Sequence, residues 1–305
     1  MSCEVTASAG TDAGGARPAP LDPTTLARVP GVIGEIGRAR AADLAAREPS
    51  DAPGRPVAAA CAAGLRDVLA GRAAAGRLPA VVAEVKRASP SLGAIADLDP
   101  LATARAYAAA GAAAVSVLTE PHRFGGALAH LRVVAAAVPL PTLRKDFVVD
   151  PRQLEGAARA GARAVLLIVG LLGEAVGPYL RYARALGLDA LVEVHDEAEL
   201  ELAAAAGARL IGVNNRDLRS LAIDPTVAPR LIRLGRRRLP DATWVAESGY
   251  RDGVSLARLT GVADAVLVGS HLAGSGDPGE ALATFLAAAR RAHGGGGPGS
   301  VAAPS

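Results

Sequence analysis

Short runs of apolar and β-branched residues recur along the chain from Val81 onward, and segments with helical spacing separate them. The runs are 81–85, 114–118, 140–143, 164–169, 190–194, 210–213, 243–246 and 265–268. Between them, apolar residues return every three or four positions, as on one face of a helix, for example over 101–110, 153–160 and 197–206. Each of these three segments ends in Ala-Gly-Ala, where a glycine suits the left-handed residue that closes a helix.

Strands that alternate with helices predict successive βαβ units on a parallel sheet. Eight such units that close on themselves form a (β/α)8 TIM barrel, which we predict over residues 80–292. The alternative is an open doubly wound sheet, which usually carries a Gly-rich turn after its first strand. The segment after 81–85 has no such turn, so the sequence favours the barrel.

The sequence outside the barrel divides into three parts. Residues 1–22 hold almost no large apolar side chains and predict a disordered leader, and the Gly-rich residues 293–305 predict a disordered tail. Residues 23–79 show helical spacing around Ile33 and again around Leu65, which predicts an N-terminal helical extension. This extension either packs on the outside of the barrel or forms a lid over its active site.

Composition narrows the class of protein. The 305 residues are 50% hydrophobic but only 3% aromatic, which predicts a core of Ala, Val, Leu and Ile spread over many similar elements. A net charge of +3 gives no basis for a nucleic-acid partner, and no apolar stretch reaches the roughly 18–20 residues of a membrane span. Cys3 and Cys61 suggest neither a disulfide framework nor a metal site, and residues 1–4 do not resemble a secretory signal. We therefore predict a cytoplasmic protein; the oligomeric state stays open and is compatible with a monomer.

Polar residues at the ends of the predicted strands are the candidate chemistry, because active sites of such barrels form at the carboxyl ends of the strands. Glu84 and Lys86 are two residues apart on one strand, so both point into the barrel mouth, where they form either a structural ion pair or part of a site. Lys145 and Glu193 end two further strands, and this convergence favours acid–base chemistry. His195 either joins this pocket or caps the next helix. We found no metal-ligand spacing and no dinucleotide loop, so we expect no metal and no cofactor.

Small residues after the last two strands indicate a phosphate site. Ser248-Gly249 and Gly269-Ser270 stand at matching positions, where backbone N–H groups can approach a ligand closely. The corresponding loops of (β/α)8 barrels commonly bind phosphate. A small phosphorylated molecule is therefore the expected substrate.

Six strings at the strand ends resemble the indole-3-glycerol phosphate synthase family of tryptophan biosynthesis. They are AEVKRASPS (83–91), SVLTEPHRFGG (116–126), LRKDFVVDPRQ (143–153), LVEVHDEAEL (191–200), IGVNNRDL (211–218) and VAESGY (245–250). They occur in family order along the whole predicted barrel. The resemblance implies a cofactor-independent carboxy-lyase that converts 1-(2-carboxyphenylamino)-1-deoxyribulose 5-phosphate to indole-3-glycerol phosphate.

The resemblance also implies roles for residues. Lys145 would act as general acid, Glu193 would stabilise the developing cation or help in proton transfer, and Glu84 would be the final base. Lys86 would pair with the substrate. Which of the two lysines, Lys145 or Lys86, acts as the general acid in each step stays open. Asn214 and Ser248 would orient the substrate; Ser89, Gly249, Gly269 and Ser270 would hold the phosphate; Phe147 would pack on the anthranilate ring and Arg216 would brace the site.

The chain departs from the family pattern at three places. Leu92 stands where many members have Lys, residues 269–273 differ from the usual phosphate-loop sequence, and the extension lacks the aromatic residue expected before the first strand. Three alternatives remain: a sugar-phosphate isomerase such as phosphoribosylanthranilate isomerase, a non-catalytic barrel that binds an anion or partner, and the same ring closure on a modified anthranilate. The isomerase would need a Cys/Asp pair at the mouth, where this chain has Glu84 and Lys86.

Overall fold

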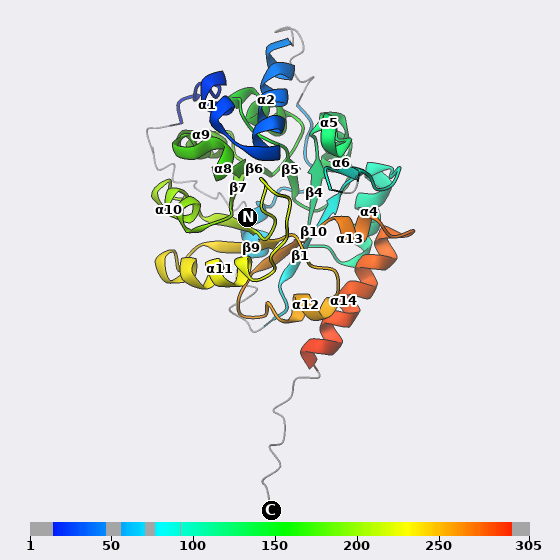
Figure 1. Ribbon diagram of the computed structural model, residues 1–305. Helices are drawn as coiled ribbons and strands as arrows, with labels where there is room; N and C mark the ends of the chain where they lie inside the picture. The colour runs from blue at the N-terminus through cyan, green and yellow to red at the C-terminus, as the bar shows by residue number, and fades with distance from the viewer. Residues whose placement is uncertain (1–14, 47–55, 71–76, 92, 295–305) are drawn as a thin grey trace, which may run out of the picture.

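The computed structural model describes residues 15–46, 56–70, 77–91 and 93–294. In this part of the chain, eight parallel strands close into a barrel with helices around it (Figure 1). The barrel strands are β1 (Ala80–Val85), β4 (Ala114–Leu118), β5 (Thr142–Lys145), β6 (Ala164–Ile168), β7 (Asp189–Val194), β8 (Leu210–Asn214), β9 (Thr243–Glu247) and β10 (Ala265–Val268). Each pairs with its neighbours in sequence, and β10 pairs with β1 to complete the ring.

Helices follow the strands on the outside of the barrel, and a short hairpin of β2 (Ala88–Ser89) and β3 (Gly93–Ala94) follows β1. The helices of the barrel are α4 (Pro100–Ala110), α5 (Pro121–Phe124), α6 (Leu128–Ala137), α7 (Pro151–Arg159), α8 (Val169–Leu172), the 3-10 helix η2 (Gly173–Ala175), α9 (Val176–Ala185), α10 (Glu197–Ala205), α11 (Val227–Arg238), α12 (Gly253–Ala257), α13 (Ser270–Ala273) and α14 (Pro278–Gly294). The predicted (β/α)8 TIM barrel is thus confirmed.

The boundaries of the elements follow local chemistry. The third predicted strand, 140–143, lies two residues further on as β5, because Pro141 directly before it has no N–H to donate to the ladder. The glycines of the Ala-Gly-Ala motifs adopt positive φ angles, as predicted: 100° at Gly111, 84° at Gly161 and 74° at Gly207. These left-handed residues end the helices and turn the chain toward the next strand.

The core has two layers. Side chains on the outer face of the strands pack against the helices, with Trp244 and Tyr107 fully buried among them. Gly235 on α11 permits this packing, since a Cβ there would lie 2.0 Å from Trp244 Cη2. The inner layer fills the barrel with small and branched side chains such as Val82 and Leu166. Aromatic residues are therefore confined to a few sites, in line with the composition.

The N-terminal extension contains α1 (Pro23–Arg28), α2 (Gly31–Ala46) and α3 (Leu65–Leu69), and α2 packs against α8 (Figure 1). The leader was expected to be disordered through residue 22, but its described part, residues 15–22, lies against the barrel. Leu21 N–H donates to the Val149 carbonyl at 2.8 Å, and the Tyr179 hydroxyl donates to the Ala19 carbonyl at 3.1 Å. Backbone hydrogen bonds, the Arg17 Nε–Glu155 Oε1 ion pair at 2.6 Å and the packing of Leu21 on the core hold this segment, and composition does not reveal these contacts.

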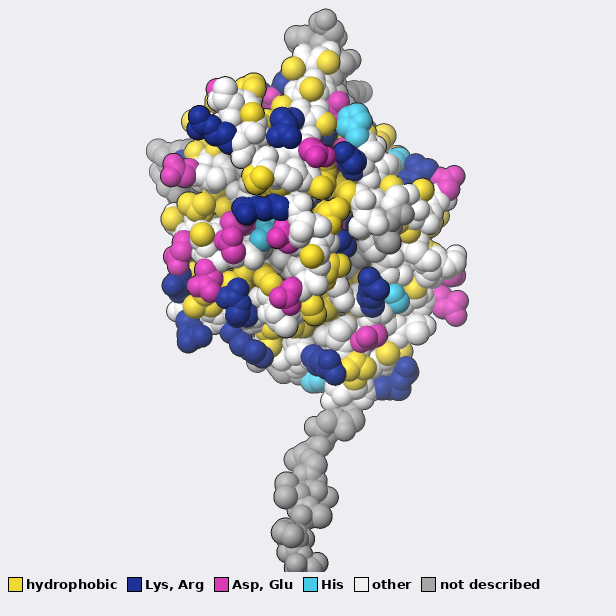
Figure 2. Space-filling model, viewed as in Figure 1, with side chains coloured by type: hydrophobic (Ala, Val, Ile, Leu, Met, Phe, Trp, Pro, Cys, Tyr) yellow, Lys and Arg dark blue, Asp and Glu magenta, His cyan; other side chains and the backbone are white. Residues whose placement is uncertain are grey.

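The other end of the chain also differs slightly from the expectation. Helix α14 continues to Gly294, two residues into the predicted tail, and residues 295–305 lie outside the described part, as do residues 1–14. None of the helices described is long and apolar enough to cross a membrane. Lys/Arg and Asp/Glu side chains are interspersed on the face shown in Figure 2.

Candidate active site

Alternate residues of each barrel strand point into the barrel, and this alternation decides which side chains meet at its mouth. Val82 and Leu143 are inward positions and belong to the inner core. Glu84 and Lys145 follow them by two residues on the same strands, so they also point inward, at the carboxyl ends. The equivalent inward positions of β7, β8 and β9 hold Glu193, Asn214 and Glu247.

Lys145 is the centre of this group. Its Nζ lies 2.8 Å from Glu193 Oε2 and 2.7 Å from Glu247 Oε2, so one ammonium bridges two carboxylates from different strands. Burial alone would lower the pKa of Lys145, but the attraction of Glu193 and Glu247 outweighs it and raises the pKa. Lys145 is therefore protonated at neutral pH, the form that a general acid requires.

The two carboxylates beside Lys145 differ in their affinity for protons. Burial would raise the pKa of Glu193, but the attraction of Lys145 and His195 lowers it, and Asn214 Nδ2 donates to its Oε1 at 3.1 Å. Burial raises the pKa of Glu247 to about 7 against the attraction of Lys145, and repulsion from Glu193 adds to the increase. These contacts favour the ionised form of Glu193 and the protonated form of Glu247.

A second pair of opposite charges lies at the end of β1. Lys86 Nζ is 3.6 Å from Glu84 Oε1, and Ser116 Oγ donates to Glu84 Oε2 at 3.2 Å. Burial lowers the pKa of Lys86, and the positive charges of Arg216 and Lys145 lower it further, against the attraction of Glu84. Glu84 and Lys86 form an ion pair, and both also line the cavity at the mouth. The pair can therefore be a structural contact and part of the site at the same time.

Apolar side chains form one wall of the mouth. The rings of Phe124 and Phe147 lie 5.9 Å apart between centroids, and Lys86 Nζ lies 5.4 Å from the Phe124 centroid. Ile33 and Ile36 of α2 line the cavity beside these rings. The N-terminal extension therefore covers one side of the mouth rather than lying remote from it, and the arrangement suits a flat aromatic group close to a cation.

Small residues line another part of the mouth. Ser248 and Gly249 have positive φ angles of 65° and 89°, which turn the chain sharply after β9. Gly269 after β10 leaves room for Glu84, since a Cβ at position 269 would lie 2.4 Å from Glu84 Oε1. Gly249, Gly269 and Ser270 line one cavity together with Ser248 and Arg216. Exposed backbone N–H groups in such loops suit an anion.

The structure brings nearly all the predicted site residues together. One cavity is lined by Glu84, Lys86, Lys145, Phe147, Glu193, Asn214, Arg216 and Ser248. The cavity with Gly249, Gly269 and Ser270 shares Glu84, Lys86, Arg216 and Ser248 with it, so the two adjoin. Ser89 is the exception, because it lines the apolar side near Phe147 instead of the cavity with the glycines. His195 does not cap α10, since Asp196 does so, and it lies 3.4 Å from Glu193 Oε1 instead.

Two members of the site were not among the sequence candidates. Glu247 lies within the string 245–250 but receives no role from the sequence, and Phe124 lies on α5, where no strand pattern points to it. A glycine could have indicated Glu247: a Cβ at Gly212 on β8 would lie 2.1 Å from Glu247 Oε1. Lysine usage is a second signal, because Lys86 and Lys145 are the only lysines in the sequence. Surface cations in this chain are arginines, and both ε-amines lie in the mouth of the barrel.

A metal ion needs several ligating side chains that converge on one point. In the part of the chain that the structure describes, no cluster of three or more His, Cys, Asp or Glu side chains is arranged to hold a metal ion. The ionisable groups at the mouth satisfy one another as Lys–Glu pairs instead.

A closed barrel with ionisable side chains gathered at the carboxyl ends of its strands defines the class of this protein, a (β/α)8-barrel enzyme. The family is more specific. The family model described as indole-3-glycerol phosphate synthase matches residues 48–285, and the chain belongs to this family.

Similar proteins agree with this assignment. The chain is 51% identical over 267 residues to indole-3-glycerol phosphate synthase of Deinococcus radiodurans, a match that covers 88% of this chain and 99% of that protein. It is 54% identical over 202 residues to the protein of the same name from Nocardioides sp., covering 65% and 76% respectively. A solved structure described as "Native KDPGal structure" aligns with a TM-score of 0.51 and 18% identity over 70% of this chain and 95% of that one. This last likeness concerns the fold alone.

Proposed function

We propose that this protein closes the indole ring of indole-3-glycerol phosphate. The substrate is 1-(2-carboxyphenylamino)-1-deoxyribulose 5-phosphate, and the products are indole-3-glycerol phosphate, CO2 and water. The observation that carries the proposal is the Lys145 ammonium held 2.8 and 2.7 Å from two carboxylates at the mouth of a barrel of this family.

Ring closure needs an acid at the substrate's ketone. The aromatic carbon that bears the carboxylate attacks the ketone carbon, and the ketone oxygen must receive a proton as the C–C bond forms. Lys145 is the donor, because its raised pKa keeps it protonated until a developing alkoxide withdraws the proton. Glu193 stays ionised beside it and stabilises the cation that develops on the substrate nitrogen and ring. Loss of CO2 then restores the aromatic ring.

Dehydration requires a second acid and a base. Lys86 stands across the mouth, with its pKa lowered by burial, and protonates the departing hydroxyl or pairs with the substrate carboxylate. Glu84, 3.6 Å from Lys86, accepts the final proton from the ring carbon. Asn214 and Ser248 orient polar groups of the substrate between these pairs.

The two walls of the mouth fit the two ends of the substrate. The anthranilate ring packs on Phe147 and Phe124, and the phosphate binds in the loops of Gly249, Gly269 and Ser270. Arg216 lines both cavities, and its Nη1 donates to the Leu221 carbonyl at 2.9 Å, which fixes it between the two ends. No step uses a metal or an organic cofactor. Cys61 forms no disulfide with a described residue, which suits a reducing compartment, and we place the reaction in the cytoplasm.

A continuous fluorescence assay tests this function. Purified protein is mixed with the carboxyphenylamino-deoxyribulose phosphate in the presence of EDTA, and indole emission is followed over time. We expect turnover by the wild type and a fall in kcat of roughly 10²-fold or more for Lys145→Ala, the size expected for a lost general acid. Arg230→Ala is the control, because the ion pair that Arg230 forms with Glu197 is exposed on both sides. No turnover by folded wild-type protein would refute the proposed function.

A further inference from the structure

His195 is the first residue after β7 and lies beside the group around Lys145 without belonging to it. Its Nε2 is 3.4 Å from Glu193 Oε1, on the carboxylate that also contacts Lys145 and Asn214. This Nε2 atom is buried and has no hydrogen-bond partner among the described residues, so its contact with Glu193 is an ion pair rather than a hydrogen bond. The reaction described above does not use His195.

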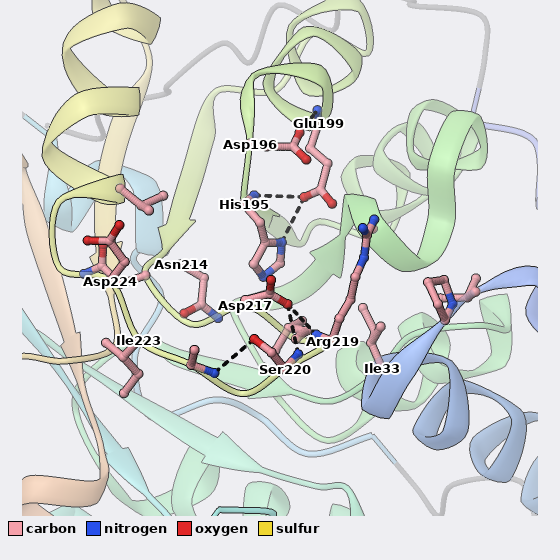
Figure 3. Close-up of a pocket in the computed structure, with 17 residues that line it drawn as sticks. Ile33, His195, Asp196, Glu199, Asn214, Asp217, Arg219, Ser220, Ile223 and Asp224 are labelled. Atoms are coloured by element: carbon pink, nitrogen blue, oxygen red, sulfur yellow. Dashed lines mark hydrogen bonds and ion pairs between the residues drawn. The ribbon is translucent and has the colours of Figure 1, made fainter.

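Glu199 fixes the position of His195. Glu199 Oε2 accepts from the backbone N–H of His195 at 2.9 Å and lies 2.9 Å from its Nδ1, the two dashed lines that join these residues in Figure 3. Room for this carboxylate comes from Gly170 on α8, since a Cβ there would lie 2.7 Å from Glu199 Oε1. The imidazole is thus held by a carboxylate on one nitrogen and faces a second carboxylate on the other.

The contacts of His195 distinguish the two glutamates that share Lys145. Glu193 faces the ammonium of Lys145 on one oxygen and the imidazole of His195 on the other. Glu247 contacts Lys145 but no second cation among the described residues, the charges of Glu193 and Glu84 repel it, and its Oε1 has no hydrogen-bond partner there. The single positive charge of Lys145 cannot neutralise the negative charges of both carboxylates. Glu193, which has a second cation in His195, therefore stays ionised, and Glu247 takes up the proton.

We propose that His195 is a cationic positioning residue that keeps Glu193 ionised and fixed against Lys145 and Asn214, and thereby makes Glu247 the carboxylate that exchanges a proton. This inference rests on the proposed function, whose general acid is Lys145. His195 acts through Glu193, because its Nε2 lies 3.4 Å from that carboxylate and His195 is not among the residues that line the cavity with Lys145 and Glu193.

The charges around His195 support a cation at this position. Glu193 on β7, Glu199 on α10 and Asp217 in the loop after β8 are its acidic neighbours, and Lys145 is the cation beyond Glu193. Burial alone would lower the pKa of His195, but Glu193 and Glu199 outweigh it and raise the pKa to about 10. The imidazole therefore stays doubly protonated through the neutral range. It does not serve as a proton shuttle, which needs a pKa close to the working pH.

Replacing His195 by a neutral side chain tests the proposal. In His195→Gln the Glu193–Glu247 pair loses a positive charge at 3.4 Å, so the pair takes up its first proton at higher pH. We expect the midpoint of the kcat–pH profile near neutral pH to rise by about one unit, with KM nearly unchanged. Whether the ionised or the protonated pair is the active form, this midpoint moves in the same direction. His195→Lys keeps the cation, and we expect it to restore the wild-type midpoint.

Glu199, which holds His195, has a matched control in Glu197 on the same turn of α10. We expect Glu199→Gln to shift the profile in the same direction as His195→Gln. We expect Glu197→Gln to leave it unchanged, because Glu197 is exposed and, among the described residues, pairs with Arg230 and not with His195. A His195→Gln profile that coincides with the wild-type profile would overturn the proposal, and so would an equal effect of the two glutamate variants.

A measurement without substrate separates this inference from the proposed function. The sequence has five histidines, so the ring nitrogens can be followed by NMR and the His195 signals assigned by their loss in His195→Gln. We expect the ring to be doubly protonated at pH 8 in the wild type and to titrate at lower pH in Glu199→Gln. A ring that titrates near the ordinary histidine value of about 6.5 would overturn the inference, even if the enzyme turns over normally. If the His195 ring is doubly protonated at pH 8 but the protein does not turn over the substrate, only the proposed function is refuted.

Discussion

Arg40 of the N-terminal extension forms a buried ion pair with the strand that carries Lys145. Arg40 Nε lies 3.0 Å from Asp146 Oδ1 and Arg40 Nη2 lies 3.0 Å from Asp146 Oδ2, so the contact is bidentate. The side chain of Arg40 is only 3% exposed and that of Asp146 is 0% exposed. Asp146 also accepts the backbone N–H of Phe147 at 2.9 Å. The extension is therefore tied to the two residues that follow the candidate acid.

Replacing Arg40 by leucine fills most of the volume but leaves Asp146 without this partner. Breaking one side of a buried ion pair costs about 3–5 kcal/mol. Arg144 Nη2 at 2.8 Å and Thr119 Oγ1 at 2.7 Å remain on Asp146, so the loss falls at the low end of that range. We expect the free energy of unfolding of Arg40→Leu to fall by about 3 kcal/mol, and KM to rise because α2 lines the mouth.

Urea unfolding followed by circular dichroism measures this loss. Arg123→Leu is the matched control, because Arg123 pairs with Glu35 at 3.2 Å while both side chains are at least half exposed. Such surface pairs contribute about 0–1 kcal/mol. If Arg40→Leu were no less stable than Arg123→Leu, the reasoning about burial would be wrong.

The stability lost in Arg40→Leu should also depend on pH, in a direction that the pKa of Asp146 sets. Burial would raise the pKa of Asp146, but Arg144 and Arg40 outweigh it, and the pKa is lowered. A depressed carboxyl pKa stabilises the folded state above the unfolded value of about 3.9, and this stabilisation is lost as the pH falls through the folded pKa. The difference between the wild type and Arg40→Leu should therefore be constant from about pH 5 to 8 and shrink below about pH 4.

Two glycines give further predictions. A Cβ in Gly212→Ala would lie 2.1 Å from Glu247 Oε1 and push this carboxylate away from Lys145, so kcat should fall roughly 10–10²-fold, as for a displacement of about 1 Å. Steady-state kinetics with unchanged circular dichroism would check this, and an unaltered kcat would show that Glu247 does not need this position. In Gly249→Ala, a φ of 89° and a Cβ 2.9 Å from Ile223 Cγ2 should distort the anion loop and raise KM severalfold with a smaller effect on kcat. Titration with inorganic phosphate would check it by weaker competitive inhibition, and an equal inhibition constant would contradict it.

Much of the fold was predictable because its signals are local. Runs of β-branched residues defined the strands, and glycines at 111, 161 and 207 marked the ends of helices, since only glycine adopts the required backbone angles without strain. The errors were local too. Pro141 delays β5 by two residues, and residues 15–22 bind the barrel through backbone hydrogen bonds and the Arg17–Glu155 ion pair, which composition cannot show.

The candidate site was predictable only in part. The carboxyl ends of strands are identifiable from sequence, so Glu84, Lys145 and Glu193 could be proposed together. Ser89 is predicted with the phosphate loops, yet it lines the apolar cavity near Phe147, because it belongs to the β2–β3 hairpin and not to the loops after β9 and β10. Phe124 was missed because a one-turn helix after β4 carries no pattern that points inward.

The sequence by itself determined the barrel, the inward positions of its strands and the chemical types gathered at one end. These follow from the two-residue period of a strand and from the residues that end each element, which are properties of neighbouring positions in the chain. Only the tertiary structure decided which charges meet. Closure of the ring brings Lys145, Glu193 and Glu247 together from β5, β7 and β9, and it sets His195 against only one of the two carboxylates. Charge interactions depend on distance and burial, so the proton affinity of each group emerges only when strands far apart in sequence are packed side by side.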